Sequence, residues 1–170
     1  MLHIYTGNGK GKTTAAVGLA VRACGAGLRV AVFQFLKNGS SSEISVLRSM
    51  PGITVEACKC CNKFVFRMSE EEKSAVKKRH NEELSAAIEL VRSGKADMLI
   101  MDELIGAFNM KLIDENNALL LTELAKDCEI VLTGRDPDER FIAAADYVSE
   151  IAPVRHPYEK GITARKGIEY

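Results

Sequence analysis

The residues best suited to chemistry in this chain lie between Thr6 and Thr14, where the sequence reads Thr-Gly-Asn-Gly-Lys-Gly-Lys-Thr-Thr. The three glycines let the backbone turn tightly and direct several N–H groups at one point. The helix predicted from Thr13 to Ala26 adds the positive end of its dipole there. This pattern is typical of a phosphate-binding loop, although the usual spacing would have a glycine at Thr6. The alternative is a plain glycine-rich turn without a ligand.

Five side chains complete a nucleotide site if the loop binds phosphate. Lys12 is placed to reach the outer phosphates and the Thr13 hydroxyl to hold Mg²⁺. A predicted apolar strand at 96–101 ends in Asp102 and Glu103, and one of these carboxylates would hold Mg²⁺ while the second orients water or contacts the ribose. Arg135 follows the next predicted strand, and it either stabilises charge on a leaving phosphate group or forms a surface ion pair.

The length and charge of the chain limit the number of domains and the class of protein to which it can belong. Its 170 residues suffice for one domain, residues 1–170, with a real hydrophobic core. Lys and Arg number 23, as do Asp and Glu, so the formal net charge is zero. That balance argues against a broad nucleic-acid or membrane surface. The sequence contains no apolar run of membrane-spanning length and no signal peptide is expected, so we predict a cytoplasmic protein.

Predicted strands and helices alternate along the chain, which favours an α/β fold with a mainly parallel sheet and helices on both faces, similar to P-loop NTPases of the RecA-like kind. The first helix is almost entirely small or apolar, so we expect it to be well buried, with Gly18 close to the sheet. Ser69 and Glu72 form a capping box for a long helix that ends near Ser93. The remaining predicted strands span 29–34, 53–57, 128–132 and 147–151, and further helices begin at Asp114 and at Asp136–Pro137.

Five cysteines are expected to be reduced thiols rather than disulfides. Cys24 and Cys128 are interpreted as small core residues. Cys58, Cys60 and Cys61 form a C-x-C-C cluster that lacks a second cysteine or histidine pair, and it is either an incomplete metal site or a set of reactive or merely tolerated thiols. His80, on the apolar stripe of the long helix, is interpreted as a packed or interface residue rather than a ligand.

Beyond these motifs, the chain resembles the ATP:corrinoid adenosyltransferases of the cobalamin pathway almost from end to end. The tail discriminates best, because phosphate loops occur in many unrelated enzymes. The matching segments are the loop through Ala16, Arg22–Ala23, Gly25-x-Gly27, Gln34-Phe35-x-Lys37, Asp102–Leu104, Thr133–Arg135, Arg155–Tyr158 and Gly161–Tyr170.

The resemblance implies transfer of the 5′-deoxyadenosyl group of ATP to Co(I) of a reduced corrinoid, with release of triphosphate. It implies ATP held in the reverse sense along the loop and Mg²⁺ bound by Thr13, Asp102 and Glu103. Lys12, Thr13, Glu103 and Arg135 would act in catalysis. The residues expected to bind ATP are Gly7, Asn8, Gly9, Lys10, Gly11, Lys12, Thr13 and Thr14, with Arg22 as a lesser candidate.

The family also excludes the lower cobalt ligand with aromatic side chains after the third strand. Here Phe64 and Phe66 occupy that segment, either as the wedge against the corrin or as two ordinary core phenylalanines. The resemblance further implies an electron-donating flavoprotein or similar reductase and a homodimer. Some members cover the corrinoid with an N-terminal extension, whereas this chain starts at its first strand, so we expect the tail or a partner subunit to do so.

Two other functions remain open on the residues alone. One is a kinase similar to thymidine kinase, although the Cys58–Cys61 cluster is a poor match to a zinc lasso. The other is a regulatory module that binds MgATP without releasing triphosphate.

Overall fold

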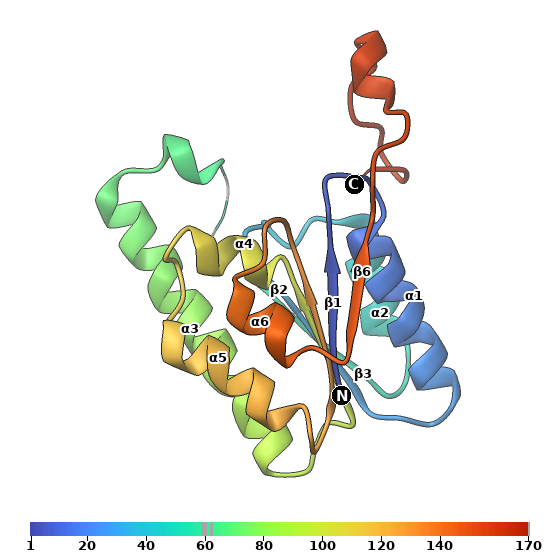
Figure 1. The fold of residues 1–170 in the computed structure, drawn as a ribbon, viewed down its shortest axis with the longest axis vertical. Helices are drawn as coiled ribbons and strands as arrows, with labels where there is room; N and C mark the ends of the chain where they lie inside the picture. The colour runs from blue at the N-terminus through green and yellow to red at the C-terminus, as the bar shows by residue number, and fades with distance from the viewer. Residues whose placement is uncertain (59–60, 62, 170) are drawn as a thin grey trace.

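A computed structural model describes residues 1–169 apart from 59, 60 and 62. Six parallel strands form one sheet in the order β3-β2-β4-β5-β1-β6 (Figure 1). This architecture confirms the predicted α/β class with a parallel sheet. The strands are β1 (Leu2–Thr6), β2 (Val30–Gln34), β3 (Ile53–Ala57), β4 (Met98–Asp102), β5 (Glu129–Thr133) and β6 (Tyr147–Glu150). The helices are α1 (Lys12–Gly25), α2 (Ser42–Ser49), α3 (Glu70–Arg92), α4 (Leu104–Asn109), α5 (Glu115–Leu124) and α6 (Glu139–Ala144), with short 3₁₀ turns at Val65–Arg67 and Pro157–Lys160.

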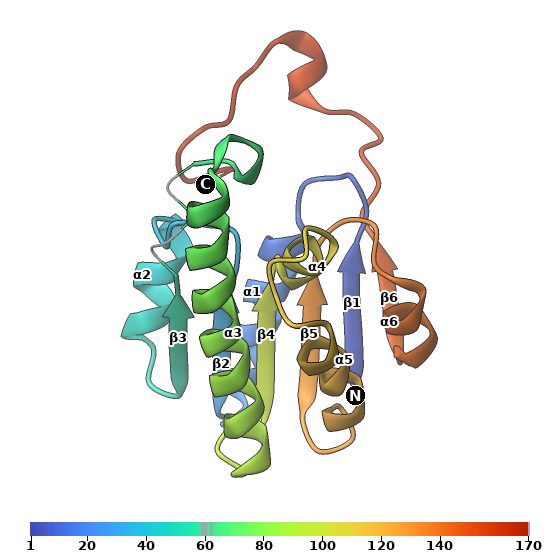
Figure 2. The same cartoon turned by 90° about the vertical axis from the view of Figure 1, so that its left-hand side faces the viewer.

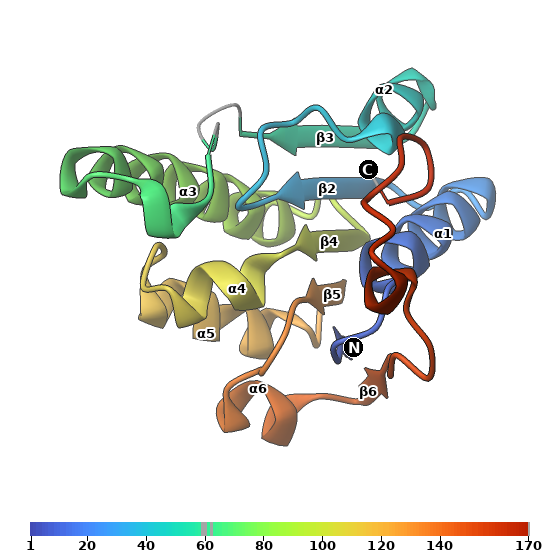
Figure 3. The same ribbon diagram turned by 90° about the horizontal axis from the view of Figure 1, so that it is seen from above.

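The helices cover both faces of the sheet in two layers, α1 and α2 on one side and α3 to α6 on the other (Figure 3). Alternate residues of the central strands serve the two layers. In β4, Met98 and Ile100 pack toward α1, whereas Leu99 and Met101 join the core beneath α3 and α5. Every residue of β2 and β4 is buried. Covering both faces explains why these strands are continuously apolar.

Helix α1 differs from the prediction that it is well buried. Only Lys12, Ala16, Ala20 and Ala23 are buried, whereas Thr14, Ala15, Gly18, Val21 and Arg22 are exposed. A Cβ added to Gly18 would have no neighbour within 4 Å, so this glycine does not approach the sheet. The reason is that one stripe of the helix meets the sheet and no described element covers the opposite stripe.

The predicted helix starts were mostly correct. The Ser69–Glu72 capping box is present at α3, and Asp114 caps α5 by accepting a 2.8 Å hydrogen bond from Asn117 N–H. Helix α6 begins after Asp138, later than the predicted start at Asp136–Pro137, because the Asp138 carboxylate accepts from Arg140 N–H. Helices α2 and α4, which are only 8 and 6 residues long, were not predicted.

The carboxyl ends of the strands meet at one edge, together with the loop that joins β1 to α1. Residues 151–169 leave β6 and pass over this edge toward β2 and β3 (Figure 2). In parallel α/β sheets, ligands bind at this edge. None of the described helices is long and apolar enough to cross a membrane.

Candidate active site

Residues 7–11 connect β1 directly to α1, as expected for a phosphate-binding loop. Gly7 and Gly11 have φ angles of 97° and 129°, which favour glycine. A Cβ added to Gly7 would lie 2.5 Å from the Ile151 carbonyl oxygen, so a side chain would displace the tail. The Lys12 ammonium donates hydrogen bonds to the carbonyls of Gly7 (2.6 Å) and Gly9 (2.9 Å). Lys12 therefore curls over the loop, where a phosphate could compete for it.

One N–H group of the loop already has a partner in the protein. Gly9 N–H donates a 2.7 Å hydrogen bond to the Ile151 carbonyl, just after β6. This contact differs from the expectation that the N–H groups from Gly7 to Thr13 all face the phosphates. It arises because β6 lies beside β1 at the sheet edge and directs the chain over the loop.

Asp102 is the centre of the polar network at the strand ends, and its residue is only 2% exposed. The parallel register pairs Gln34 with Asp102 across β2 and β4. Asp102 accepts hydrogen bonds from Thr13 Oγ1 (2.8 Å), Thr133 Oγ1 (2.8 Å), Lys37 Nζ (2.8 Å) and Gln34 Nε2 (3.3 Å). Four side chains from three separate parts of the chain thus converge on one carboxylate.

The residues around Asp102 fit a Mg²⁺ ion. The Thr13 hydroxyl and the Asp102 carboxylate are hard oxygen ligands in direct contact, which suits this ion. Gln34 Oε1 is buried and has no hydrogen-bond partner among the described residues, so it is available to a water bound to a metal. Burial alone would lower the pKa of Lys37, but the adjacent Asp102 carboxylate raises it overall, so Lys37 stays a cation here.

Glu103 lies beside this network, as predicted, but in an unusual backbone conformation. Its φ of 61° is left-handed, and its N–H donates a 2.9 Å hydrogen bond to Thr133 Oγ1. Burial and then the Asp102 charge raise the pKa of Glu103. A Cβ added to Gly106 would lie 3.5 Å from Glu103 Oε2, so the carboxylate lies against the first turn of α4.

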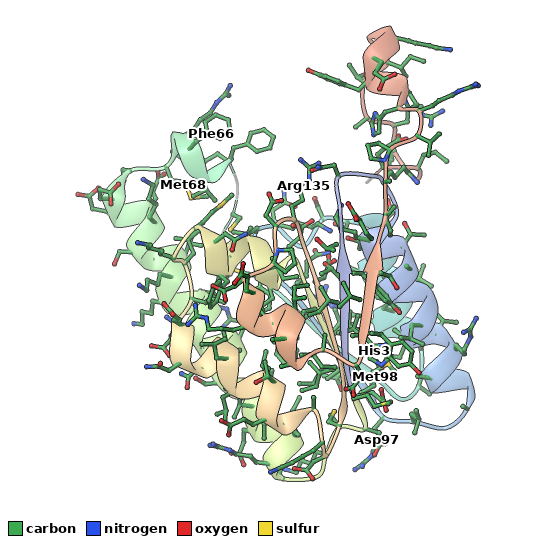
Figure 4. The ribbon with its side chains drawn as sticks, in the orientation of Figure 1. His3, Phe66, Met68, Asp97, Met98 and Arg135 are labelled. Atoms are coloured by element: carbon green, nitrogen blue, oxygen red, sulfur yellow. The ribbon has the colours of Figure 1, made fainter. Side chains whose placement is uncertain are left out.

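The structure brings Arg135 to the site but not Arg22. Arg135 is exposed at the carboxyl edge of the sheet (Figure 4). Burial, and after it the charge of Arg135, lowers the pKa of Lys12. Arg135 and Lys12 are therefore close enough to repel each other and to attract the same anion. Arg22 lies ten residues beyond Lys12 on α1, which is about 15 Å along a helix. The predicted contact of Arg22 with ATP is therefore unsupported by its position.

A cavity of about 1270 Å³ joins the phosphate loop to the aromatic segment. Lys10, Thr13 and Thr14 line one part, and Phe64 and Phe66 line another. The two phenylalanines are 70% and 77% exposed, and their rings stack 5.5 Å apart at 13°. Figure 4 shows Phe66 at the same end of the molecule as Arg135. The alternative that these are core phenylalanines is wrong, because the segment before α3 stands away from the sheet.

Comparison with known proteins agrees with this geometry. The family described as ATP:corrinoid adenosyltransferase BtuR/CobO/CobP matches residues 1–170. The chain belongs to this family. It is 32% identical to the corrinoid adenosyltransferase of Escherichia coli K12 over 98% of this chain and 84% of that protein. Its identity is 29% to the Pseudomonas aeruginosa enzyme, over 100% and 83% of the two chains, and 31% to CobA of Salmonella typhimurium LT2, over 98% and 84%.

The chain is therefore a transferase that uses ATP to adenosylate corrinoids, in cobalamin synthesis or salvage. Three polar residues of this adenosyltransferase site were absent from the predicted set, namely Gln34, Lys37 and Thr133. The first two stand in the segment Gln34-Phe35-x-Lys37 and the third in Thr133–Arg135, both of which carry the family resemblance. Their position after apolar strands was the available signal, but it does not reveal which carboxylate they contact.

One cysteine near β3 departs from the expectation of reduced thiols. Cys58 is bonded in a disulfide, which contradicts that expectation, and the crowding of three cysteines within four residues explains why a bond can form here. Cys60 lies outside the described residues. Cys61 and Cys128 are buried and Cys24 is half-buried, so the interpretation of Cys128 as a core residue is confirmed.

Proposed function

We propose that the cavity between the phosphate loop and Phe64–Phe66 holds ATP and a reduced corrinoid together, with C5′ of ATP facing the cobalt. The single observation that carries this proposal is the continuity of the cavity from Thr13 to Phe66. Its volume of about 1270 Å³ exceeds that of an ordinary small-molecule pocket, about 300–1,000 Å³, and a corrin is a large ring.

The reaction requires positioning more than acid–base chemistry. The Co(I) electron pair attacks C5′, a Co–C bond forms, and the C5′–O5′ bond breaks with its electrons leaving on the triphosphate. Because Co(I) is itself a strong nucleophile, no general base is needed, and a positioned C5′ with a neutralised leaving group suffices.

The residues at the strand ends suit the leaving triphosphate. Lys12 exchanges its contacts with the Gly7 and Gly9 carbonyls for phosphate oxygens, and Arg135 approaches the same charge from β5. Thr13 and Asp102 hold Mg²⁺, with Glu103 beside them. When bound, this ion neutralises phosphate charge. Lys37 adds a cation at Asp102.

Phe64 and Phe66 suit the corrin end of the cavity. Two exposed, stacked rings form an apolar surface of the kind that packs against a flat macrocycle. Packed against the lower corrin face, they leave no room for an axial ligand on cobalt, which makes Co(II) easier to reduce. A flavoprotein or similar reductase would supply that electron.

The test is an anaerobic incubation of the protein with MgATP and chemically reduced cob(I)alamin, followed by visible spectroscopy and identification of the phosphate product. We expect a light-sensitive cobalt–carbon product and intact triphosphate. ADP with unchanged cobalt would instead indicate a kinase or ATPase. Tight ATP binding without turnover would indicate a regulatory module.

The predicted homodimer is tested separately by light scattering at micromolar concentration. We expect a mass near twice 18.6 kDa. A monomer that is fully active would remove any role for a partner subunit in covering the corrin.

A further inference from the structure

Three buried side chains that the adenosyltransferase site does not use converge beneath the aromatic segment. Cys58, His80 and Glu83 each offer a ligand atom, and these atoms all lie within 4.8 Å of one another. Cys61 is next to them, with its Sγ 4.0 Å from His80 Nε2. Sulfur, imidazole nitrogen and carboxylate oxygen together are a donor set that zinc prefers.

His80 and Glu83 come from one face of α3, since they are three residues apart on a helix. Their residues are 0% and 2% exposed. His80 Nδ1 and both Glu83 carboxylate oxygens have no hydrogen-bond partner among the described residues. Buried polar atoms are nearly always satisfied, so three unpaired atoms on two neighbouring buried side chains require an explanation.

The protein neighbours satisfy these groups only in part. Arg79 Nε lies 3.3 Å from Glu83 Oε1, but without hydrogen-bond geometry, and the Arg79 side chain is 44% exposed. Leu36 N–H donates a long hydrogen bond of 3.4 Å to His80 Nε2, and the Leu112 backbone is a further partner of this ring. The charges of Glu56 and Glu82 add to that of Glu83. An apolar cluster around Cys61 completes the surroundings, namely Leu36, Val65, Met68, Val76 and Leu112.

The electrostatics of the cluster agree with the geometry. Burial raises the pKa of Glu83 to about 7 and lowers the pKa of His80 to about 4. Arg79 also pairs with Glu56 and Glu82, so its single charge is shared among three carboxylates, and a divalent cation would add the charge that the buried Glu83 lacks.

We propose that Cys58, His80 and Glu83 bind a zinc ion in the reduced protein, with Cys61 as the fourth ligand. Zinc bonds to such ligands are about 2.0–2.3 Å, so donor atoms 4.8 Å apart need to move by only about 1 Å. The sequence pattern conceals the site, because C-x-C-C has no second cysteine pair and the remaining ligands stand about 20 residues later on a helix.

Reduction must precede zinc binding, because Cys58 is bonded in a disulfide. A dithiol reductant transfers two electrons and two protons to that disulfide, giving two thiols, and becomes a disulfide itself. Zinc then displaces the thiol proton of Cys58 as the thiolate binds. Cys58 Sγ can thus form the disulfide or bind zinc, but not both at once.

The zinc ion would join the segment that carries Phe64 and Phe66 to α3. Without it, this segment contacts α3 through the small apolar cluster around Met68, through Cys61 Sγ and His80 Nε2 (4.0 Å), and through the ion pair of Lys63 with Glu72 (2.7 Å). This inference does not depend on the proposed function, since metal binding is measured without ATP or corrinoid.

The first experiment is a Co²⁺ titration of the full chain, reduced with a dithiol and desalted under nitrogen. We expect one equivalent to bind, with the visible bands of tetrahedral Co²⁺ and a near-ultraviolet thiolate-to-cobalt band. Zn²⁺ should displace the Co²⁺ and raise the Tm of the reduced protein. The oxidised protein should show neither effect. Absence of the thiolate band from the reduced protein would overturn the proposal.

Variants identify the ligands. Glu83→Gln and Cys58→Ser should each weaken Co²⁺ binding tenfold or more, and Cys58→Ser should also reduce the thiolate band. Cys24→Ser is the matched control, because this half-buried thiol donates to the Pro51 carbonyl (3.0 Å), away from the cluster. Equal affinity in all four proteins would overturn the assignment. If a variant fails to fold, the Co²⁺ spectrum and the Zn²⁺-dependent Tm of the wild type still show whether the reduced protein binds a metal through a thiolate.

Discussion

At the scale of single residues, Asp102 organises the phosphate end of the site. It is nearly inaccessible and accepts hydrogen bonds from Thr13, Gln34, Lys37 and Thr133. Lys37 balances its charge and also lies 3.3 Å from the Thr13 hydroxyl. The cation, the carboxylate and the hydroxyl are therefore assembled before any nucleotide binds. Such preorganisation favours a site that must stabilise a highly charged leaving group.

Lys37→Met tests this arrangement. Removing the ammonium leaves the buried Asp102 carboxylate without its cation, and one charge-assisted hydrogen bond contributes about 1.5–3 kcal/mol. We expect KM for ATP to rise about tenfold or more, since 1.4 kcal/mol corresponds to a factor of ten. Steady-state kinetics with pre-reduced corrinoid measure it. Lys78→Met, which removes an exposed lysine on α3, is the control, and an unchanged KM in Lys37→Met would contradict the interpretation.

At the scale of elements, local signals at helix starts and strand starts hold the layers in place. The capping box binds both ends of the first turn of α3: Glu72 N–H donates to Ser69 Oγ (3.2 Å), and Ser69 N–H donates to Glu72 Oε2 (2.7 Å). At the opposite end of the sheet, Asp97 joins the starts of β2 and β4 through Arg29 (Figure 4).

Ser69→Ala should destabilise the protein by about 1 kcal/mol, because it removes the oxygen that satisfies an otherwise unpaired N–H group of α3. Urea unfolding followed by circular dichroism measures the change. Ser74→Ala, at an exposed position inside the same helix, should leave the stability unchanged or raise it slightly. Equal stability of Ser69→Ala and the wild type would show that the cap contributes nothing.

The ion pair of Asp97 with Arg29 is expected to make the free energy of unfolding fall at low pH. Hydrogen bonds from Arg29 lower the pKa of Asp97 from 3.8 to about 2. Because the folded pKa lies below the unfolded one, the stabilisation is complete above about pH 4 and disappears as the pH falls through 2. In Asp97→Asn, urea midpoints should decline less between pH 4 and pH 2 than in the wild type. Asp127→Asn, at an exposed turn, should follow the wild type, and identical slopes in all three would refute the assignment.

At the scale of the whole molecule, the large cavity belongs to no single element. Its lining comes from the loop between β1 and α1, the segment before α3, the loop after β2 and the tail, including Ile168 and Glu169. The tail passes above the strand ends and contacts the loop through the Ile151 carbonyl (Figure 2). A tail in this position suits the expectation that it helps to cover the corrinoid.

Phe64→Ala tests whether the Phe64 ring acts on the reduction of Co(II) or on the transfer to Co(I). If the ring excludes the lower cobalt ligand, turnover that starts from Co(II) with a reductant should fall by tenfold or more, whereas turnover from pre-reduced Co(I) should change little. Parallel assays with the two cobalt states measure the ratio. Val46→Ala, an exposed apolar position on α2, is the control, and equal losses from Co(II) and Co(I) in Phe64→Ala would rule out the wedge.

Patterns of neighbouring residues determined the parts of this protein that depend on local physics. The glycines of the loop, the Ser69 cap and the apolar strands each specify a conformation within a few residues, so the parallel α/β fold and the tight turn between β1 and α1 were predictable. Tertiary structure alone decided which carboxylate Lys37 meets, because the two residues are 65 positions apart and only the β2–β4 pairing joins them.

The same distinction explains the failures and the unforeseen cluster. The apolar sequence of α1 does not determine how many of its faces other elements cover, so its exposed stripe was not predicted. A phenylalanine in a short segment is apolar whether it enters the core or faces a cavity, and only the placement of that segment distinguished the two. Cys58 and Glu83 are 25 positions apart, and they meet because α3 packs beside the end of β3. Contacts between distant residues depend on which layers cover each other, and no local pattern encodes that.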